Sequence, residues 1–272
     1  MRIMLIGDIV GRPGRQALAE LLPSFIQSEA IDFCVANAEN AAGGAGITIA
    51  VMQELLAMPI DVLTSGDHIW DKKEIVPVAR TEPRLLRPAN LSAEAAGRGA
   101  GLYQARNGVT VGVINLQGRT FMKPSDCPFH AARRTVEELR KSTNVILVDM
   151  HAEATSEKVA MGWFLDGQVS AVFGTHTHVQ TADESILPNG TAYITDLGMT
   201  GPYKSVIGRR TDRVLEAVYT QMPTTFDVAR EDARIGGAVV TVAPPTGRAT
   251  DITRVQLCSP STLHGGQAGS GR

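Results

Sequence analysis

Residues 1–11 read MRIMLIGDIVG, an apolar run that ends in a glycine and an aspartate. The Ile- and Leu-rich residues 3–6 have the length of a short buried strand. Pro13 then stands at the expected first residue of a helix, where its missing N–H breaks no hydrogen bond. That helix is indicated by apolar residues at helical spacing, namely Ala17, Leu18, Leu21, Leu22 and Ile26. The start of the chain therefore predicts a strand, a polar turn and a helix.

The same alternation of apolar runs and helical patterns recurs along the chain. Further runs that predict strands are residues 33–36, 62–63, 111–114, 145–148, 171–173 and 193–195. Residues 237–242 and 252–257 flank the turn sequence Pro244-Pro245-Thr246-Gly247 and predict a closing hairpin. Strands that alternate with helices indicate an α/β (α+β) fold in which the strand pairing is at least partly parallel.

The domain organisation follows from length and composition. A chain of 272 residues corresponds to one large domain or two small ones. No internal repeat and no linker divides the sequence, so we expect a single domain over residues 1–258. Residues 259–272 are rich in Gly, Ser and Gln, and they predict a disordered tail.

Charge and cysteine content narrow the class of protein. A formal net charge of −2 disfavours a protein that holds long nucleic acids mainly by phosphate contacts. No apolar run of about 18 residues occurs, so we expect no membrane segment. The three cysteines form no Cys-x-x-Cys pair, which disfavours both a disulfide framework and a zinc ribbon. These features together predict a cytoplasmic globular protein.

Five of the apolar runs are followed by polar residues that are able to hold a metal ion. These residues are Asp8, Glu39 with Asn40, Asp67 with His68, His151, His176 and His178. In open α/β sheets, ligand sites form outside the carboxyl ends of the strands, so residues far apart in sequence converge there. Any one of these residues, taken alone, is better explained as a helix cap, a turn former or a structural histidine.

The pair His176-x-His178 adds weight to a metal site. Residues i and i+2 at a strand end point the same way, so both imidazoles are expected to face one point. Imidazoles, carboxylates and one amide oxygen form a mixed set of ligands that suits Mn, Fe or Zn. Seven candidate ligands are too many for one tetrahedral zinc ion. The set favours a binuclear hydrolytic site.

Long motifs in a fixed order carry a resemblance to a known family. They are GDIVG (7–11), NAENAAGG (37–44), SGDHIWDKKE (65–74), INLQGRTF (114–121), DMHAEATSEK (149–158), GTHTHVQTAD (174–183) and ITDLGMTGP (194–202). The chain closely resembles the YmdB-like group of calcineurin-like metallophosphoesterases. The resemblance implies a four-layer sandwich of two facing mixed β-sheets flanked by helices. It also implies a homo-oligomer that hydrolyses small phosphodiesters, including 2′,3′-cyclic and 3′,5′-cyclic nucleotides.

The resemblance also implies a role for each motif residue. Glu39 would bridge two divalent ions (Fe, Mn or Zn), Asp8, Asn40 and His178 would complete the first metal site, and Asp67, His151 and His176 would complete the second. A hydroxide between the ions would attack phosphorus in line, and His68 would donate a proton to the leaving oxygen.

Two positions depart from related patterns. Broader relatives carry Asp-x-His after the first strand, whereas position 10 here is Val, and Asn40 would take that coordination place. The family's Gly-Asn-His is Gly66-Asp67-His68 in this chain. With Asp8, Glu39 and Asp67 ionised against two divalent ions, one net positive charge remains, where Asn at 67 would leave two. We expect Asp67 to hold the second metal more tightly but to weaken the attraction for an anionic phosphate.

Two alternatives remain open at the level of sequence. A phosphomonoesterase or a nuclease could use the same metal site. A regulatory protein could also retain the metals, turn over slowly and act through binding. For the phosphodiesterase that the resemblance implies, the expected partner is a small cyclic nucleotide or related phosphodiester, with neither a membrane nor a long nucleic acid.

Overall fold

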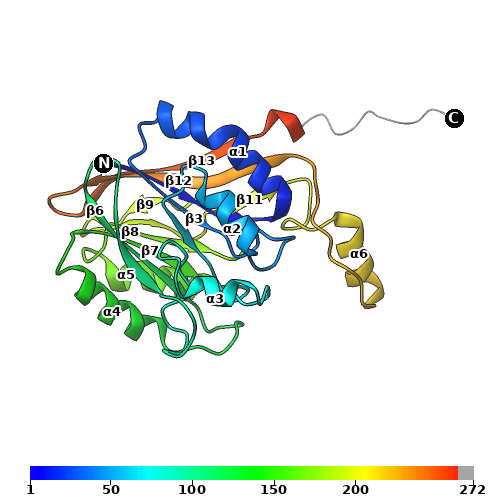
Figure 1. Cartoon of the computed structure of the whole chain (residues 1–272), viewed down its shortest axis with the longest axis horizontal. Helices are drawn as coiled ribbons and strands as arrows, with labels where there is room; N and C mark the ends of the chain where they lie inside the picture. The colour runs from blue at the N-terminus through cyan, green and yellow to red at the C-terminus, as the bar shows by residue number, and fades with distance from the viewer. Residues whose placement is uncertain (263–272) are drawn as a thin grey trace.

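Two β-sheets lie face to face in the computed structural model of the chain, and helices cover their outer sides (Figure 1). The structure describes residues 1–262. The first sheet contains β1 (Arg2–Ile6), β2 (Asp8–Ile9), β3 (Phe33–Asn37), β4 (Val62–Thr64), β11 (Met199–Pro202), β12 (Ala233–Ala243) and β13 (Arg248–Cys258). The second contains β5 (Ala100–Gln104), β6 (Thr110–Gln117), β7 (Val145–His151), β8 (Ala171–Thr175), β9 (Ser185–Ile186) and β10 (Ala192–Ile194).

Six α-helices accompany the sheets within residues 1–262. They are α1 (Gly11–Ser28), α2 (Ile49–Leu56), α3 (Ile75–Ala79), α4 (Pro128–Leu139), α5 (Thr155–Leu165) and α6 (Thr211–Thr220). Helix α1 covers the first sheet, and α4 and α5 lie on the opposite side of the molecule against the second sheet (Figure 1). The mixed α/β class predicted from the sequence is confirmed.

Parallel pairing sets the direction of the strands that lead to the site. In the first sheet, β1 is parallel to β3, and β3 is parallel to β4. In the second sheet, β6, β7 and β8 are parallel neighbours. The carboxyl ends of each parallel set therefore meet at one edge of their sheet. The predicted closing hairpin is also present, because β12 and β13 pair antiparallel, with a register shift between Thr241 and Val242.

Alternating side chains divide the core into three apolar clusters. On β1, Ile3 and Leu5 join a cluster that receives residues from both sheets, whereas Met4 and Ile6 join a cluster that includes residues of α1. A third cluster packs the second sheet against α4 and α5. Strands that are apolar on both faces are typical of sheets covered on both sides, and the period of two sends successive residues to opposite faces.

The inter-sheet faces of the strands become polar toward their carboxyl ends. On β7, Leu147 belongs to the inter-sheet cluster, and Asp149 and His151 occupy the next two positions of the same face. On β8, Phe173 is followed in the same way by Thr175. The apolar core therefore leads into a buried polar region at the strand ends.

Three local predictions need correction. Helix α1 begins at Gly11 and not at Pro13; Gly11 has a φ of +59° and donates its N–H to the main-chain oxygen of Asn40, which ties the start of the helix to the segment after β3. Strands β2, β5, β9 and β11 are not predicted, since each is short or weakly apolar. Residues 259–262 do not belong to a disordered tail: Ser259 is buried and donates a hydrogen bond to Glu20, and a short helix spans Pro260–Thr262. The remainder of the predicted tail, 263–272, lies outside the described residues.

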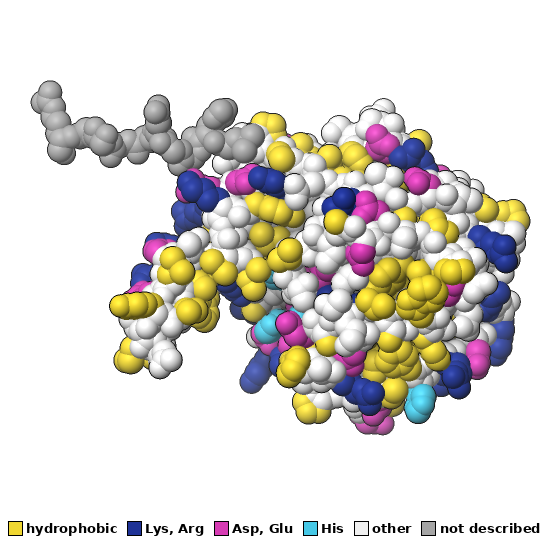
Figure 2. Space-filling model, turned by 180° about the vertical axis from the view of Figure 1, so that it is seen from behind, with side chains coloured by type: hydrophobic (Ala, Val, Ile, Leu, Met, Phe, Trp, Pro, Cys, Tyr) yellow, Lys and Arg dark blue, Asp and Glu magenta, His cyan; other side chains and the backbone are white. Residues whose placement is uncertain are grey.

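Helix α6 projects from the body of the molecule (Figures 1 and 2). None of its residues is buried, and its apolar side chains include Leu215, Val218 and Tyr219, with Tyr219 92% exposed. The homo-oligomer expected from the sequence stays a prediction, as does the single domain over residues 1–258. Within residues 1–262, every helix is too short or too polar to cross a bilayer.

The inter-sheet cluster makes a stability prediction. Phe33 is fully buried between the sheets, so Phe33→Ala removes a large apolar side chain and leaves a cavity. We expect the free energy of unfolding to fall by about 3–5 kcal/mol in urea denaturation. The exposed Tyr219→Ala is the matched control, with a change within about 0.5 kcal/mol. Equal effects in the two variants would contradict this view of the core.

Candidate metal centre

The structure brings all seven predicted ligand residues together at the carboxyl ends of the strands. Asp8 follows β1, Glu39 and Asn40 follow β3, Asp67 follows β4, His151 ends β7, and His176 and His178 follow β8. The first sheet thus supplies four of these residues and the second sheet supplies three. The site exists only where the two sheets meet.

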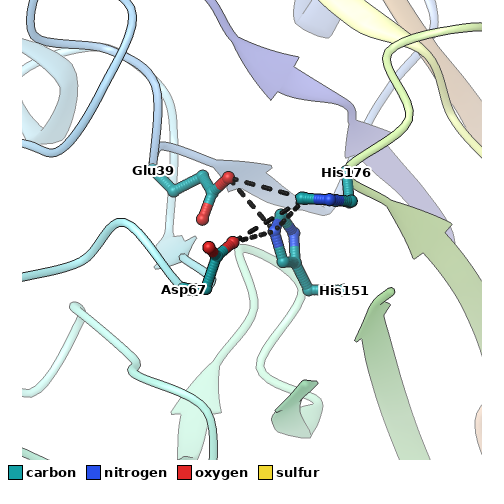
Figure 3. Close-up of side chains that lie close together, drawn as sticks. All are labelled: Glu39, Asp67, His151 and His176. Atoms are coloured by element: carbon teal, nitrogen blue, oxygen red, sulfur yellow. Dashed lines mark hydrogen bonds and ion pairs between the residues drawn. The ribbon is translucent and has the colours of Figure 1, made fainter. Parts of the chain in front are cut away.

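Four of these residues form one compact group (Figure 3). Glu39, Asp67, His151 and His176 each place one potential ligand atom within 4.8 Å of the others. Nε2 of His151 is 3.1 Å from Oε1 of Glu39 and 3.6 Å from Oδ1 of Asp67. Nδ1 of His176 is 3.8 Å from Oδ1 of Asp67. The mixed nitrogen and oxygen atoms of this group could hold a divalent transition metal.

The remaining three residues lie next to that group, with Glu39 between. Nε2 of His178 is 3.8 Å from Oδ1 of Asp8. The amide nitrogen of Asn40 is 3.2 Å from Nε2 of His178 and 3.1 Å from Oε1 of Glu39. Ligation by Asn40 would use its amide oxygen, which a half-turn of the amide places in the same position. Asp8, Asn40, His178 and Glu39 thus form a second possible set of ligands.

Burial of unpaired carboxylate oxygens supports metal binding. Asp8 and Glu39 are fully buried, and within residues 1–262 their ion-pair partners are histidines alone. Oδ1 of Asp8 and Oδ1 of Asp67 are buried without a hydrogen-bond partner. A buried carboxylate without compensation is costly, and a divalent cation compensates such a group directly. One orphaned oxygen lies in each set of ligands, so the residues present fit metal ions.

The protonation of the site reflects this burial. Burial raises the pKa of Asp8 to about 6. Burial also raises the pKa of Glu39, but the charge and the hydrogen bond of His151 and the charge of His68 together outweigh it, so the net shift is downward. Burial and the charge of His151 lower the pKa of His176 to about 4. His176 is therefore neutral at pH 7, which is the form in which imidazole binds metals.

The close approach of the two sheets requires a glycine at position 66. A Cβ atom on Gly66 would lie 2.2 Å from Oε2 of Glu39 and 2.2 Å from Nε2 of His151. Any side chain here would therefore enter the space of the ligands. Gly66 is therefore required because the ligands pack closely against it, and not because the backbone needs an unusual φ here.

A polar network behind His151 was not predicted from the sequence. Thr175 donates its hydroxyl proton to Asp149, and its oxygen lies 2.8 Å from Nδ1 of His151. That oxygen is left to accept from Nδ1–H, which directs Nε2 toward Glu39. Asn37 and Thr64 of the first sheet also donate to Asp149, which belongs to β7 of the second sheet. The network therefore orients a ligand and ties the two sheets together.

A buried ion pair supports the segment that carries His176 and His178. Nζ of Lys158 lies 2.6 Å from Oδ2 of Asp196, and each side chain is at most 1% exposed. The same carboxylate accepts hydrogen bonds from the backbone N–H and the hydroxyl of Thr177. Thr177 stands between the two histidines, so the ion pair fixes both. The sequence held one indication of this role: Lys158 is a charged residue on the face of α5 that is otherwise apolar and buried.

The geometric reason given for the His-x-His pair is wrong. Strand β8 ends at Thr175, and His176 and His178 follow it with φ values of 99° and 64°. Neither residue has extended backbone, so the alternation of a strand does not apply. Both imidazoles reach the centre because Asp196 and the buried lysine hold this turn, and because Asp8 accepts a hydrogen bond from the N–H of His176.

His68 forms the exposed side of the centre, next to Asp67. The side chain of His68 is 36% exposed, and its Nδ1 lies 2.8 Å from Oδ2 of Asp71. Its backbone N–H donates to Oε2 of Glu39. Nζ of Lys123 donates to the main-chain oxygen of Asp67 and lies 3.6 Å from Oδ2 of its carboxylate. The additional negative charge of Asp67 thus has a positive neighbour at the surface.

Comparison with known proteins identifies the family. A family model described as YmdB-like protein matches residues 4–255. The chain belongs to the YmdB-like family. It is 46% identical over 257 residues to a 2′,3′-cyclic-nucleotide 2′-phosphodiesterase of Bacillus subtilis (strain 168), covering 94% of this chain and 97% of that relative. The resemblance predicted from the motifs is confirmed.

Two solved structures of similar proteins share the YmdB-like fold described here. A hypothetical protein from Thermus thermophilus superposes with a TM-score of 0.89 at 38% identity, covering 96% of this chain and all of that one. A protein described as a novel phosphatase from Mycoplasma pneumoniae gives a TM-score of 0.88 at 30% identity, covering 96% of this chain and 95% of that one.

The buried ion pair behind the two histidines is testable. Lys158→Met leaves Asp196 as an uncompensated buried charge, which typically costs about 3–5 kcal/mol. We expect a lower melting temperature and a clear loss of bound metal, measured by elemental analysis after dialysis. Lys141→Met, which breaks an exposed pair with Glu138 on α4, is the control and should change neither quantity. A folded Lys158→Met protein with full metal content would contradict the positioning role.

Proposed function

We propose that the protein is a binuclear metal-dependent phosphodiesterase that hydrolyses small phosphodiesters such as 2′,3′-cyclic nucleotides. Its class, a hydrolase of phosphodiester bonds, follows from the family and from the related Bacillus enzyme. The observation that carries the proposal is the pair of ligand sets around Glu39, each with one buried carboxylate oxygen that lacks a hydrogen-bond partner. The three apolar clusters support the proposal that the site is built on the four-layer arrangement of the family.

The proposed cofactors are two divalent ions, with Mn, Fe and Zn the metals that suit these ligands. Asp8, Asn40 and His178 would hold one ion, Asp67, His151 and His176 would hold the other, and Glu39 would contact both. Such ions supply Lewis acidity: they neutralise phosphate oxygens and lower the pKa of water.

His68 is the proposed proton donor. Its ring lies at the exposed side of the centre, whereas the seven ligand residues lie deeper. Asp71 binds Nδ1 and so orients the ring, which leaves Nε2 available to substrate. A ribose alkoxide leaves poorly without a proton, and a positioned acid typically accelerates such a step by about 10²–10⁴-fold. Nε2 of His68 lies 3.9 Å from Oδ2 of Asp67, so the ring stands directly beside the proposed ligands.

A phosphomonoesterase is the second candidate. It is favoured by the description of the similar Mycoplasma pneumoniae structure as a phosphatase. A nuclease with the same centre, activity on 3′,5′-cyclic nucleotides and a slow, regulatory binding protein are further outcomes of the assays below. The cytoplasmic location and the homo-oligomer stay predictions.

The proton donor can be tested directly. We expect metal-stripped protein reloaded with Mn²⁺ to hydrolyse 2′,3′-cyclic AMP, and His68→Ala to lower kcat by about 10²–10⁴-fold. Metal content is the control, because His68 is no ligand in this proposal and the variant should retain both ions. A 3′,5′-cyclic nucleotide, a phosphomonoester and a short RNA are assayed alongside.

The outcomes of this assay separate the alternatives. Faster turnover of the phosphomonoester than of every diester would replace the proposed activity with the second candidate. Two bound ions without turnover of any substrate would favour the regulatory binding protein. Loss of metal in His68→Ala would show that His68 contributes to metal binding, and would contradict its assignment as a proton donor distinct from the ligands.

Asp67 is the position where this chain departs from the family's Asn. Asp67→Asn removes one negative charge from the centre while keeping an oxygen ligand of the same size. We expect a lower KM for 2′,3′-cyclic AMP and faster loss of metal to a chelator. Steady-state kinetics and metal release measured in parallel check both. Equal KM and equal chelator sensitivity in the two proteins would contradict the charge argument, and would indicate that Lys123 already offsets the carboxylate.

A further inference from the structure

A cavity lies apart from the metal centre, between helix α4 and the segment that precedes β5. Its volume is about 670 Å³, within the range of small-molecule sites. Its lining includes Arg87, Asn90, Cys127, His130 and Arg134, and none of the proposed metal ligands. We refer to it as the α4 cavity. Neither the proposed reaction nor the family's motifs account for it.

The α4 cavity contains a buried arginine without a counter-charge. Arg87 is 7% exposed, and within residues 1–262 it takes part in no ion pair. Its Nη1 donates to the main-chain oxygen of Pro88 and its Nη2 to that of Ser92, whereas Nε is buried without a hydrogen-bond partner. Burial lowers the pKa of Arg87, and no acidic neighbour opposes this effect. Such a buried guanidinium normally has an anionic partner, because an unpaired charge in the interior is costly.

The first turn of α4 adds further positive potential to the same cavity. The helix begins at Pro128, its N-cap residue Cys127 makes no side-chain cap, and its first turn contains no acidic residue. Free N–H groups and the helix dipole favour an anion at such an end. His130 and Arg134 of this helix also line the cavity. Asp126 is the one carboxylate among the described lining residues, and it is exposed to solvent.

The walls of the α4 cavity are held in place by a buried asparagine. The amide of Asn90 donates to the main-chain oxygens of Gln117 and Asp126, and its oxygen accepts from the N–H of Gln117. The segment before α4 is thereby fixed against β6. Because these hydrogen bonds are already formed, a ligand would meet a prepared site and would not have to order it.

We propose that the α4 cavity is a binding site for a small anionic molecule, whose phosphate or carboxylate group pairs with Arg87 beside the start of α4. The guanidinium fork matches both groups, because each offers two oxygens to parallel N–H donors. The volume suits a metabolite and excludes a macromolecule. The site stands independently of the proposed phosphodiesterase activity, since the two share no lining residue.

Cys127 offers a readout that is confined to the α4 cavity. It is partly exposed in the lining, whereas Cys34 is buried and Cys258 is exposed on β13. Iodoacetamide is applied to the full-length, metal-loaded protein with inorganic phosphate, with succinate, or with sodium chloride at the same ionic strength. Peptide mass spectrometry gives the rate at each cysteine. At about ten times the dissociation constant, a bound anion leaves about one site in ten open, so alkylation of Cys127 slows about tenfold while that of Cys258 is unchanged.

Two variants link the protection to the proposed residues. Arg87→Met should abolish protection of Cys127, and the exposed Arg134→Gln should weaken it; an unchanged circular dichroism spectrum and a cooperative thermal transition report that each variant is folded. If Arg87→Met does not fold, the protection of Cys127 in Arg134→Gln still tests the proposal. Protection by phosphate alone identifies a phosphoryl ligand, and protection by succinate alone identifies a carboxylate ligand. An unchanged Cys127 rate in every anion, or protection that survives both variants, overturns the proposal.

Discussion

Negative charge buried between two sheets is the constraint on which the rest of the site depends. Asp8 and Glu39 lie in the interior, and within residues 1–262 they are accompanied there by histidines and by no lysine or arginine. Such an arrangement is stable only when cations or protons are supplied at the same place. The glycine at position 66, the histidines in left-handed backbone and the unpaired carboxylate oxygens all follow from bringing these groups within reach of one another.

The support for this charge comes from a second set of buried polar groups. Asp149 accepts hydrogen bonds from Asn37 and Thr64 across the sheet interface, so it fixes the distance between the sheets at the point where the ligands meet. Lys158 and Asp196 fix the turn after β8. The first device extends the inter-sheet core, and the second joins the outer helix α5 to the turn after β8. Both convert packing into ligand geometry.

The ligands could be predicted from the sequence because each follows an apolar run, and strand ends converge for topological reasons alone. Lys158 and Asp196 could not be paired in advance, since their contact depends on how α5 packs beside β8. Asp149 and Asn37 are visible as polar residues within apolar strands, but the pattern does not name their partners. Ser259 was assigned to a disordered tail because its partner, Glu20, lies 239 positions away in the chain. Local composition gives no information about contacts between residues so far apart in the sequence.

The position of β1 has a consequence for how the chain acquires its structure during synthesis. This strand is synthesised long before its antiparallel neighbour β12, with which it pairs Ile3 opposite Val240. Its parallel neighbour β3 is available early, but one edge of β1 stays open until β12 has been made. Pairing over such a separation is slow, and an open apolar edge invites association with other chains in the meantime. The first sheet, and with it Asp8, therefore reaches its final environment among the last parts of the molecule.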